Sequence, residues 1–332
     1  MINKMKYLVT ILICLLLVDC GTFSPKPRTP TPVDHLGRLK DKAALYTELM
    51  ETNGHRDAHG FIGTKHCDAT LFSGLLSAAL RDVDLTVARN GKQWFRRPNQ
   101  DCGSAWENSR STISRDMMLG VFYHMWYTRD LDSAVALMDQ LKSNAYFLEG
   151  QGTPGELFMI PTFMNTLAEL ILGLDGPRYS LELNLPAIFG KDTGYVAHLT
   201  VWHILLRGNI LNKIHALDMD VLEFHALRSP LNPLFQAAYH KYLDGNMTYV
   251  VQLLLNSSEW PHDRLPTTKG HCDDWPISRD HTPGDWGPCR LDNPVEHSGA
   301  ELVVLYHLLL KDQTIKEVRD GRHGPREAGS AP

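Results

Sequence analysis

The chain lacks the short motifs that mark nucleotide-dependent and serine-dependent enzymes. No Gly-x-Gly-x-x-Gly or P-loop sequence occurs, so no nucleotide cofactor is expected. No Gly-x-Ser-x-Gly is present to form a nucleophile elbow. A basic excess is missing too, because 33 Lys and Arg face 38 Asp and Glu for a net charge of −5. We therefore expect neither a cofactor nor a nucleic-acid partner.

Strand patterns are scarce, and helical periodicity dominates. Only residues 93–96 and 180–185 have the composition of short strands. Apolar residues recur at helical spacing in ten segments: 36–50, 69–80, 114–127, 131–141, 162–174, 195–211, 219–227, 233–243, 247–255 and 298–310. Several of these segments are apolar nearly all round, which favours an inner layer of helices covered by a second layer. The sequence predicts an all-α fold.

The N-terminus has the pattern of an export signal. Lys4 and Lys6 form a basic start, and residues 7–18 form an apolar stretch too short to span a membrane. The run Leu17-Val18-Asp19-Cys20-Gly21 resembles the lipobox of bacterial lipoproteins, although Asp19 stands where a small residue is usual. The resemblance implies acylation of Cys20 after cleavage. An uncleaved signal anchor is the alternative.

These features divide the chain into four parts. Residues 1–19 are the predicted signal peptide, and residues 20–33 are a Pro-rich tether of extended conformation. Residues 34–318 form a single all-α domain, and residues 319–332 are a disordered tail. The lipoprotein resemblance implies a lipid anchor in a bacterial cell envelope. Gly21, where Asp would signal retention in the inner membrane, favours the outer membrane or a site facing the periplasm.

Four cysteines remain in the predicted domain: Cys67, Cys102, Cys272 and Cys289. An even number in an exported chain predicts two disulfides, for which three pairings are open. We favour Cys67–Cys102 and Cys272–Cys289, because each would close a loop that lacks a helical pattern. No Cys-x-x-Cys spacing supports a zinc site, and oxidised cysteines leave no catalytic thiolate.

Two long segments without helical periodicity, 96–113 and 257–297, are candidates for functional loops. Carboxyl groups in or beside them could perform glycoside hydrolysis, which needs one protonated and one ionised carboxyl across a cleft. The first choices are Asp68 and Asp116, at predicted helix starts, followed by Glu296 and Asp274. Helix capping is the alternative role for an acid at a helix start.

Flat aromatic rings suit stacking on sugar faces, and arginines can grip anionic groups through paired hydrogen bonds. The candidates for substrate binding are His66, Trp106, Arg110, Arg115, His198, Trp275 and Arg279.

Two patches carry a resemblance to a group of enzymes. They are His66-Cys-Asp-Ala-Thr-Leu-Phe-Ser-Gly74 and Ser114-Arg-Asp-Met-Met-Leu-Gly-Val121, each an acid leading into an apolar helix with a glycine. The pattern resembles the inner helices of α/α-toroid carbohydrate-active enzymes, among them unsaturated glucuronyl hydrolases, family 8 glycosidases and toroidal polysaccharide lyases. The resemblance implies a toroid of antiparallel helical hairpins, with a polysaccharide or oligosaccharide bound at one end of its inner helices.

Two other functions remain open. His297 and Glu301 are four residues apart on a predicted helix, a spacing that suits a metal ion, and His281 and Asp285 share it. These pairs resemble those of helical zinc phosphodiesterases of the bacterial phospholipase C type. The third possibility is a binding lipoprotein without catalysis. Carboxyl groups of Asp68 and Asp116 within about 10 Å of each other would favour hydrolysis.

Overall fold

The computed structural model describes residues 22–23, 33–52, 56–61, 69–91, 93–98, 113, 115–144, 161–179, 195–228, 230, 232–256 and 300–310. This part of the chain is mostly helical, which confirms the predicted all-α class. None of the helices within it is both long and apolar enough to cross a membrane.

All ten predicted helical segments form helices. They are α2 (Val33–Thr52), α3 (Ala69–Leu80), α4 (Arg115–Thr128), α5 (Leu131–Ser143), α6 (Pro161–Gly173), α7 (Tyr195–Leu211), α8 (Ala216–Arg228), α9 (Pro233–Tyr239), α10 (Met247–Asn256) and α11 (Ala300–Leu305). The turn η4 (His240–Asp244) continues α9, η6 (Tyr306–Leu310) continues α11, and η1 (Leu85–Ala88) follows α3. Helix α8 begins three residues before the predicted start at 219, which places Asp218 in its first turn.

The described strands are two residues long and form two small antiparallel pairs. Strand β3 (Gln93–Trp94) lies within the predicted strand 93–96 and pairs with β2 (Arg89–Asn90). Strand β1 (Thr22–Phe23) pairs with β4 (Ile214–His215), and the sequence did not predict this pair. The predicted strand at 180–185 lies outside the described residues.

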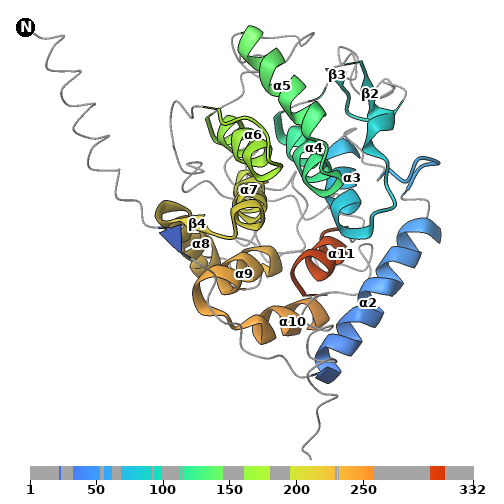
Figure 1. Ribbon diagram of the computed structural model, residues 1–332. Helices are drawn as coiled ribbons and strands as arrows, with labels where there is room; N and C mark the ends of the chain where they lie inside the picture. The colour runs from blue at the N-terminus through green and yellow to red at the C-terminus, as the bar shows by residue number, and fades with distance from the viewer. Residues whose placement is uncertain are drawn as a thin grey trace, which may run out of the picture.

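The helices form a closed series of contacts that we call the helix ring. Helix α3 contacts α4, α4 contacts α7, α7 contacts α9, α9 contacts α11, and α11 returns to α3 (Figure 1). Helix α6 lies against both α4 and α7. Helices α5, α8, α10 and α2 pack against members of the ring, and α2 and α10 lie together at the foot of Figure 1.

Side-chain contacts show that several neighbouring helices run in the same direction. Between α3 and α4, Gly74 meets Gly120, and Ser77 lies one turn on with His124. Between α6 and α7, Thr166 pairs with His203 and Glu169 with Arg207. In each pair of helices, a residue further along one helix contacts a residue further along the other, so the two helices are parallel.

Further contacts show that α9 is parallel to α7, and that the pair α3 and α4 runs in the same direction as the pair α6 and α7. His198 meets Asn232 before α9, and Asn209, later in α7, accepts a hydrogen bond from Lys241 in η4. Arg129, just after α4, lies 3.6 Å from Asp175, just after α6. Helices α3, α4, α6, α7 and α9 therefore all begin at one end, which we call the starting end, and α4, α6 and α7 finish at the opposite, finishing end.

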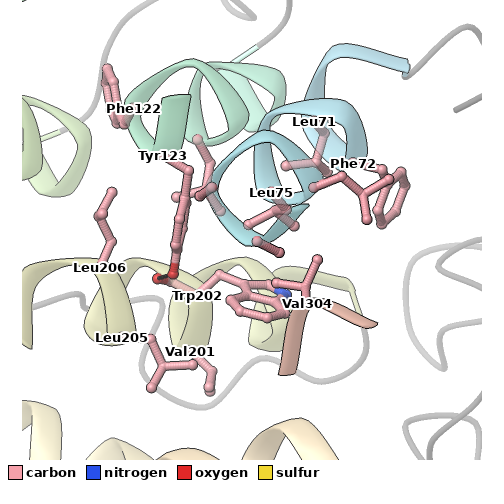
Figure 2. Packing of buried hydrophobic residues seen from close by; sticks show 14 of the residues in the cluster. Leu71, Phe72, Leu75, Phe122, Tyr123, Val201, Trp202, Leu205, Leu206 and Val304 are labelled. Carbon is pink, nitrogen blue, oxygen red and sulfur yellow. Dashed lines mark hydrogen bonds between the residues drawn. The ribbon is translucent and has the colours of Figure 1, made fainter. Parts of the chain in front are cut away.

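Side chains fill the middle of the ring. Figure 2 shows Leu71 and Leu75 of α3, Tyr123 of α4, Trp202 of α7 and Val304 of α11 packed together. The hydroxyl of Tyr123 donates to the Trp202 carbonyl oxygen at 2.8 Å, and the two rings meet edge to face at 5.9 Å. Burial raises the pKa of Tyr123 well above its usual value, so this hydroxyl remains a donor.

Two glycines allow α3 and α4 to touch backbone to backbone. A Cβ added to Gly74 would lie 2.5 Å from the Cα of Gly120, and one added to Gly120 would lie 2.6 Å from the Leu71 carbonyl oxygen. No real Cβ tolerates such contacts. Gly74 and Gly120, the glycines of the two patches that resemble toroid enzymes, are thus required for the packing of α3 against α4.

Candidate functional site

The helix beginnings next to the two first-choice acids lie at the starting end of the ring. Asp116 is the second residue of α4, and Asp68 directly precedes Ala69, the first residue of α3. Gly120, one turn after Asp116, faces the carbonyl oxygen of Thr70. Because α3 and α4 are parallel, the backbone of Asp116 and the beginning of α3 lie at the same end. Asp68 and the side chain of Asp116 lie outside the described residues, so their separation stays a prediction.

His198, also at the starting end, is the one candidate whose side chain the structure describes. It lies in the first turn of α7 and is half-buried. The amide of Asn232 donates to His198 Nε2 at 3.1 Å, and the imidazole packs 4.8 Å from the ring of Phe235. His225 packs on the same phenyl ring at 5.1 Å.

The sequence explains why His198 is held at this place. Asn232 is the N-cap of α9, and its Oδ1 accepts hydrogen bonds from the backbone N–H groups of Leu234 and Phe235 at 3.0 and 3.2 Å. Its amide nitrogen is then directed at His198. An imidazole that accepts at Nε2 carries its proton on Nδ1, which leaves a neutral ring in a fixed orientation.

The remaining predicted residues lie beyond the part of the chain that the structure describes. Among the site candidates these are Glu296, Asp274, His66, Trp106, Arg110, Trp275 and Arg279. Cys20 and the four cysteines Cys67, Cys102, Cys272 and Cys289 lie there too, with the alternative metal ligands His281, Asp285 and His297. Arg115 and Glu301 are described as helical, without their side chains. All these assignments stay predictions.

Sequence reasoning missed a cluster of charged side chains buried between three helices. Arg207 of α7 forms a two-pronged ion pair with Glu169 of α6, with Nε 2.6 Å and Nη2 2.9 Å from the carboxylate oxygens. Arg207 Nη1 lies 3.6 Å from Oδ2 of Asp218 in α8. His215 of β4 places Nε2 3.5 Å from Glu169 Oε1. The side chains of Arg207, Glu169 and Asp218 are 2%, 6% and 1% exposed, so water screens this cluster very little.

The environment of the cluster keeps Glu169 ionised. Burial acts to raise the pKa of this carboxyl, but the hydrogen bonds and charges of His215 and Arg207 outweigh it and lower the pKa. For Arg207, burial acts to lower the pKa, but the hydrogen bonds that Arg207 donates to Glu169 and the charges of Glu169 and Asp218 raise it. A general acid must hold a proton near neutral pH. Glu169 therefore cannot serve as one, and we assign the cluster to joining α6, α7 and α8.

A signal for this cluster was present in the sequence. Glu169 is the only acidic or basic residue of α6, and Arg207 is the only one of α7, apart from histidines. Charged residues are almost never fully buried unless they are paired. Two nearly apolar helices with one charge each, of opposite sign, thus indicate a pair between them.

Two buried histidines lie deeper in the ring. His203 shares a 3.1 Å hydrogen bond with Thr166 and packs 4.3 Å from the ring of Phe163. Burial, helped by the charge of Arg207, lowers the pKa of His203 to about 3. Burial also lowers the pKa of His124, against the charges of Asp84 and Asp130, and its Nδ1 lies 2.7 Å from Ser77 Oγ. Both rings are neutral at pH 7.

Within the described residues, no three His, Cys, Asp or Glu side chains are grouped so that they could hold a metal ion. The predicted pairs His281/Asp285 and His297/Glu301 fall outside that search.

Comparison with known proteins finds no family model, no curated protein and no solved structure that matches this chain.

Proposed function

We propose that this protein is an exported lipoprotein that binds or cleaves a polysaccharide at the starting end of the helix ring. Asp68 and Asp116 are its proposed paired carboxyl groups. Acylated Cys20 anchors it in a bacterial envelope, at the outer membrane or facing the periplasm. Arg115, His198 and the loop residues Trp106 and Trp275 bind the sugar in this proposal.

The observation that carries the proposal is the parallel packing of α3 and α4. The contacts of Gly74 with Gly120 and of Ser77 with His124 bring the beginnings of the two helices to one end. Each proposed acid belongs to one of these beginnings. If the helices were antiparallel, the two acids would be separated by about 18 Å, the length of a twelve-residue helix.

The ring of contacts through α3, α4, α7, α9 and α11 supports a toroid-like arrangement. In a toroid the inner helices run parallel and the outer helices return the chain between them. Helix α5 fits the returning role, because it follows α4 after a short turn at Arg129 and contacts α6. His198 and Asn232 lie at the starting end as well, which adds two polar side chains to the proposed sugar-binding face.

Parallel helix beginnings also suit the proposed chemistry. The positive end of a helix dipole favours the ionised form of a carboxyl group, and Asp116 is the second residue of α4. A negative charge close by favours the protonated form of a second carboxyl group. One ionised and one protonated carboxyl are the pair that glycoside hydrolysis requires.

The test compares Asp68→Asn and Asp116→Asn with the unchanged protein on a panel of neutral and anionic polysaccharides. Reducing-sugar release reports hydrolysis, ultraviolet absorbance of unsaturated uronates reports lyase activity, and sedimentation with the glycan reports binding. We expect turnover to fall at least about 100-fold in each variant. Asp41→Asn, an exposed acid on α2, is the matched control and should leave turnover unchanged.

Binding that is weakened in both variants while no glycan is ever cleaved would support the binding form of the proposal. If no polysaccharide is bound or cleaved, or if both Asn variants behave like Asp41→Asn, the proposed function is wrong.

A further inference from the structure

The strand pair β1–β4 lies beside the proposed lipid anchor. Thr22 and Phe23 pair antiparallel with His215 and Ile214, respectively. One residue, Gly21, separates Cys20 from this strand. Two Cα–Cα steps span about 7 Å at most, so an acyl chain on Cys20 must attach close to β4.

Strand β4 lies at the finishing end of the ring. It follows α7 after only two residues, Asn212 and Lys213. Gly173, the last residue of α6, packs against Ile210 in the last turn of α7, so the two helices finish together. In Figure 1, β1 is the blue arrow beside β4 and α8.

We propose that β1 holds the lipidated N-terminus against β4, so that the bilayer surface lies at the finishing end and the starting end faces away from the membrane. This inference rests on the proposed acylation of Cys20. In this arrangement the finishing end lies against the lipid bilayer. The proposed sugar-binding face then lies about 25 Å from the headgroups, the length of the seventeen-residue helix α7.

Pairing of β1 with β4 gives the Pro-rich segment a different role. As a free tether, residues 20–33 would lift the domain from the membrane and let it turn in any direction. Pairing of Thr22 and Phe23 with β4 instead attaches the domain directly beside the anchor and selects one orientation. The exposed Asn212 and Lys213 come next to the headgroups, where an anionic surface attracts the charge of the lysine.

The first experiment tests the strand pair in the full mature protein, whether or not it carries lipid. The variants Thr22→Cys/His215→Cys and Phe23→Cys/Ile214→Cys place cysteines on opposite partners of the ladder. Neighbouring antiparallel pairs alternate between hydrogen-bonded and closer, non-hydrogen-bonded geometry, so one of the two variants has cysteines at the shorter Cα–Cα distance. We expect mild oxidation to cross-link at least one of them, detected as a linked peptide by mass spectrometry. Thr22→Cys/Pro230→Cys is the control, because the exposed Pro230 stands two residues before Asn232, the N-cap of α9 at the starting end.

The second experiment tests the orientation. The lipidated protein is reconstituted in vesicles of phosphatidylethanolamine and phosphatidylglycerol with a headgroup-linked energy acceptor. A donor dye is attached either to Lys213→Cys at the finishing end or to Pro230→Cys at the starting end, with dye bound by the unchanged protein subtracted. We expect transfer to be strong from position 213 and several-fold weaker from position 230.

The outcomes separate the lipid anchor from the orientation of the domain. Mass spectrometry that finds no acyl group on Cys20 overturns the proposed anchor and, with it, the membrane at the finishing end. Acylated Cys20 with no cross-link in either strand variant, or with equal transfer from both positions, overturns the orientation alone. Cross-linking together with stronger transfer from position 213 supports it.

Discussion

Replacing Arg207 with methionine should be among the most destabilising single changes in the protein. The substitution keeps most of the side-chain volume but leaves Glu169 and Asp218 buried, at 6% and 1% exposure, without their cation. Removal of one partner from a buried ion pair destabilises proteins by about 3–5 kcal/mol. A loss of this size lowers Tm by about 10 °C in a domain of this size.

The direction of the pH dependence distinguishes this explanation from a simple packing defect. In the unchanged protein the pKa of Glu169 lies below its usual 4.5, so its stabilising contribution is present above pH 4.5 and is lost as the pH falls. In Arg207→Met, burial dominates and raises that pKa, so protonation relieves the buried charge. The difference in the free energy of unfolding between the two proteins should therefore shrink as the pH falls from 7 to 4.

Urea unfolding followed by far-ultraviolet circular dichroism, at a series of pH values, measures both quantities. The triple variant Arg207→Met/Glu169→Met/Asp218→Leu removes all three charges and should regain most of the stability, because apolar replacement of a whole buried cluster is often neutral. Arg129→Met is the control, since Arg129 and Asp175 form an exposed pair that contributes at most about 1 kcal/mol. A loss below about 1 kcal/mol in Arg207→Met, or a triple variant as unstable as the single one, would refute the reasoning.

Two further predictions concern the interior. Gly74→Ala should destabilise the fold by about 1–3 kcal/mol or more, because the new methyl group overlaps the backbone of Gly120. Gly37→Ala in α2 is the control, because a Cβ at this position has no atom within 4 Å. It should stabilise the fold by about 0.5–1 kcal/mol in the same urea titration. Equal effects at the two glycines would contradict the close approach of α3 and α4. His203 has a pKa of about 3 in the folded protein and 6.5 when unfolded, so its NMR signals should show no titration between pH 5 and 8. Because only the unfolded state then binds this proton, the free energy of unfolding should fall by about 1.4 kcal/mol for each pH unit below 6.5. His203→Asn should remove that slope, and a slope that persists would assign the pH dependence to other groups.

The helices were predictable because their signal is local. A period of 3.6 residues in the apolar positions marks α3 and α7 with the same boundaries that the structure has. The boundary of α8 was missed because Asp218 is polar, and its burial depends on Arg207 of another helix. The pair β1–β4 was missed because two-residue strands far apart in the chain have no periodic pattern.

The site could be predicted only as a list of candidates. Acids before apolar helices are visible in the sequence at Asp68 and Asp116, yet the sequence cannot say whether two helices run in the same direction. The contacts of Gly74 with Gly120 and of Ser77 with His124 supply that direction for α3 and α4. The separation of the two carboxyl groups and the role of the loop tryptophans remain predictions.

The chain specifies its helical class and the bounds of its helices through interactions between residues three and four positions apart. The tertiary structure alone decides which helices run parallel, which end of the ring gathers the first turns of α4 and α7, and which charges are paired in the interior. The physical reason is the range of the interactions. Helix periodicity acts within a few residues, whereas the salt bridge of Glu169 with Arg207 and the contact of Gly74 with Gly120 exist only after distant segments have packed.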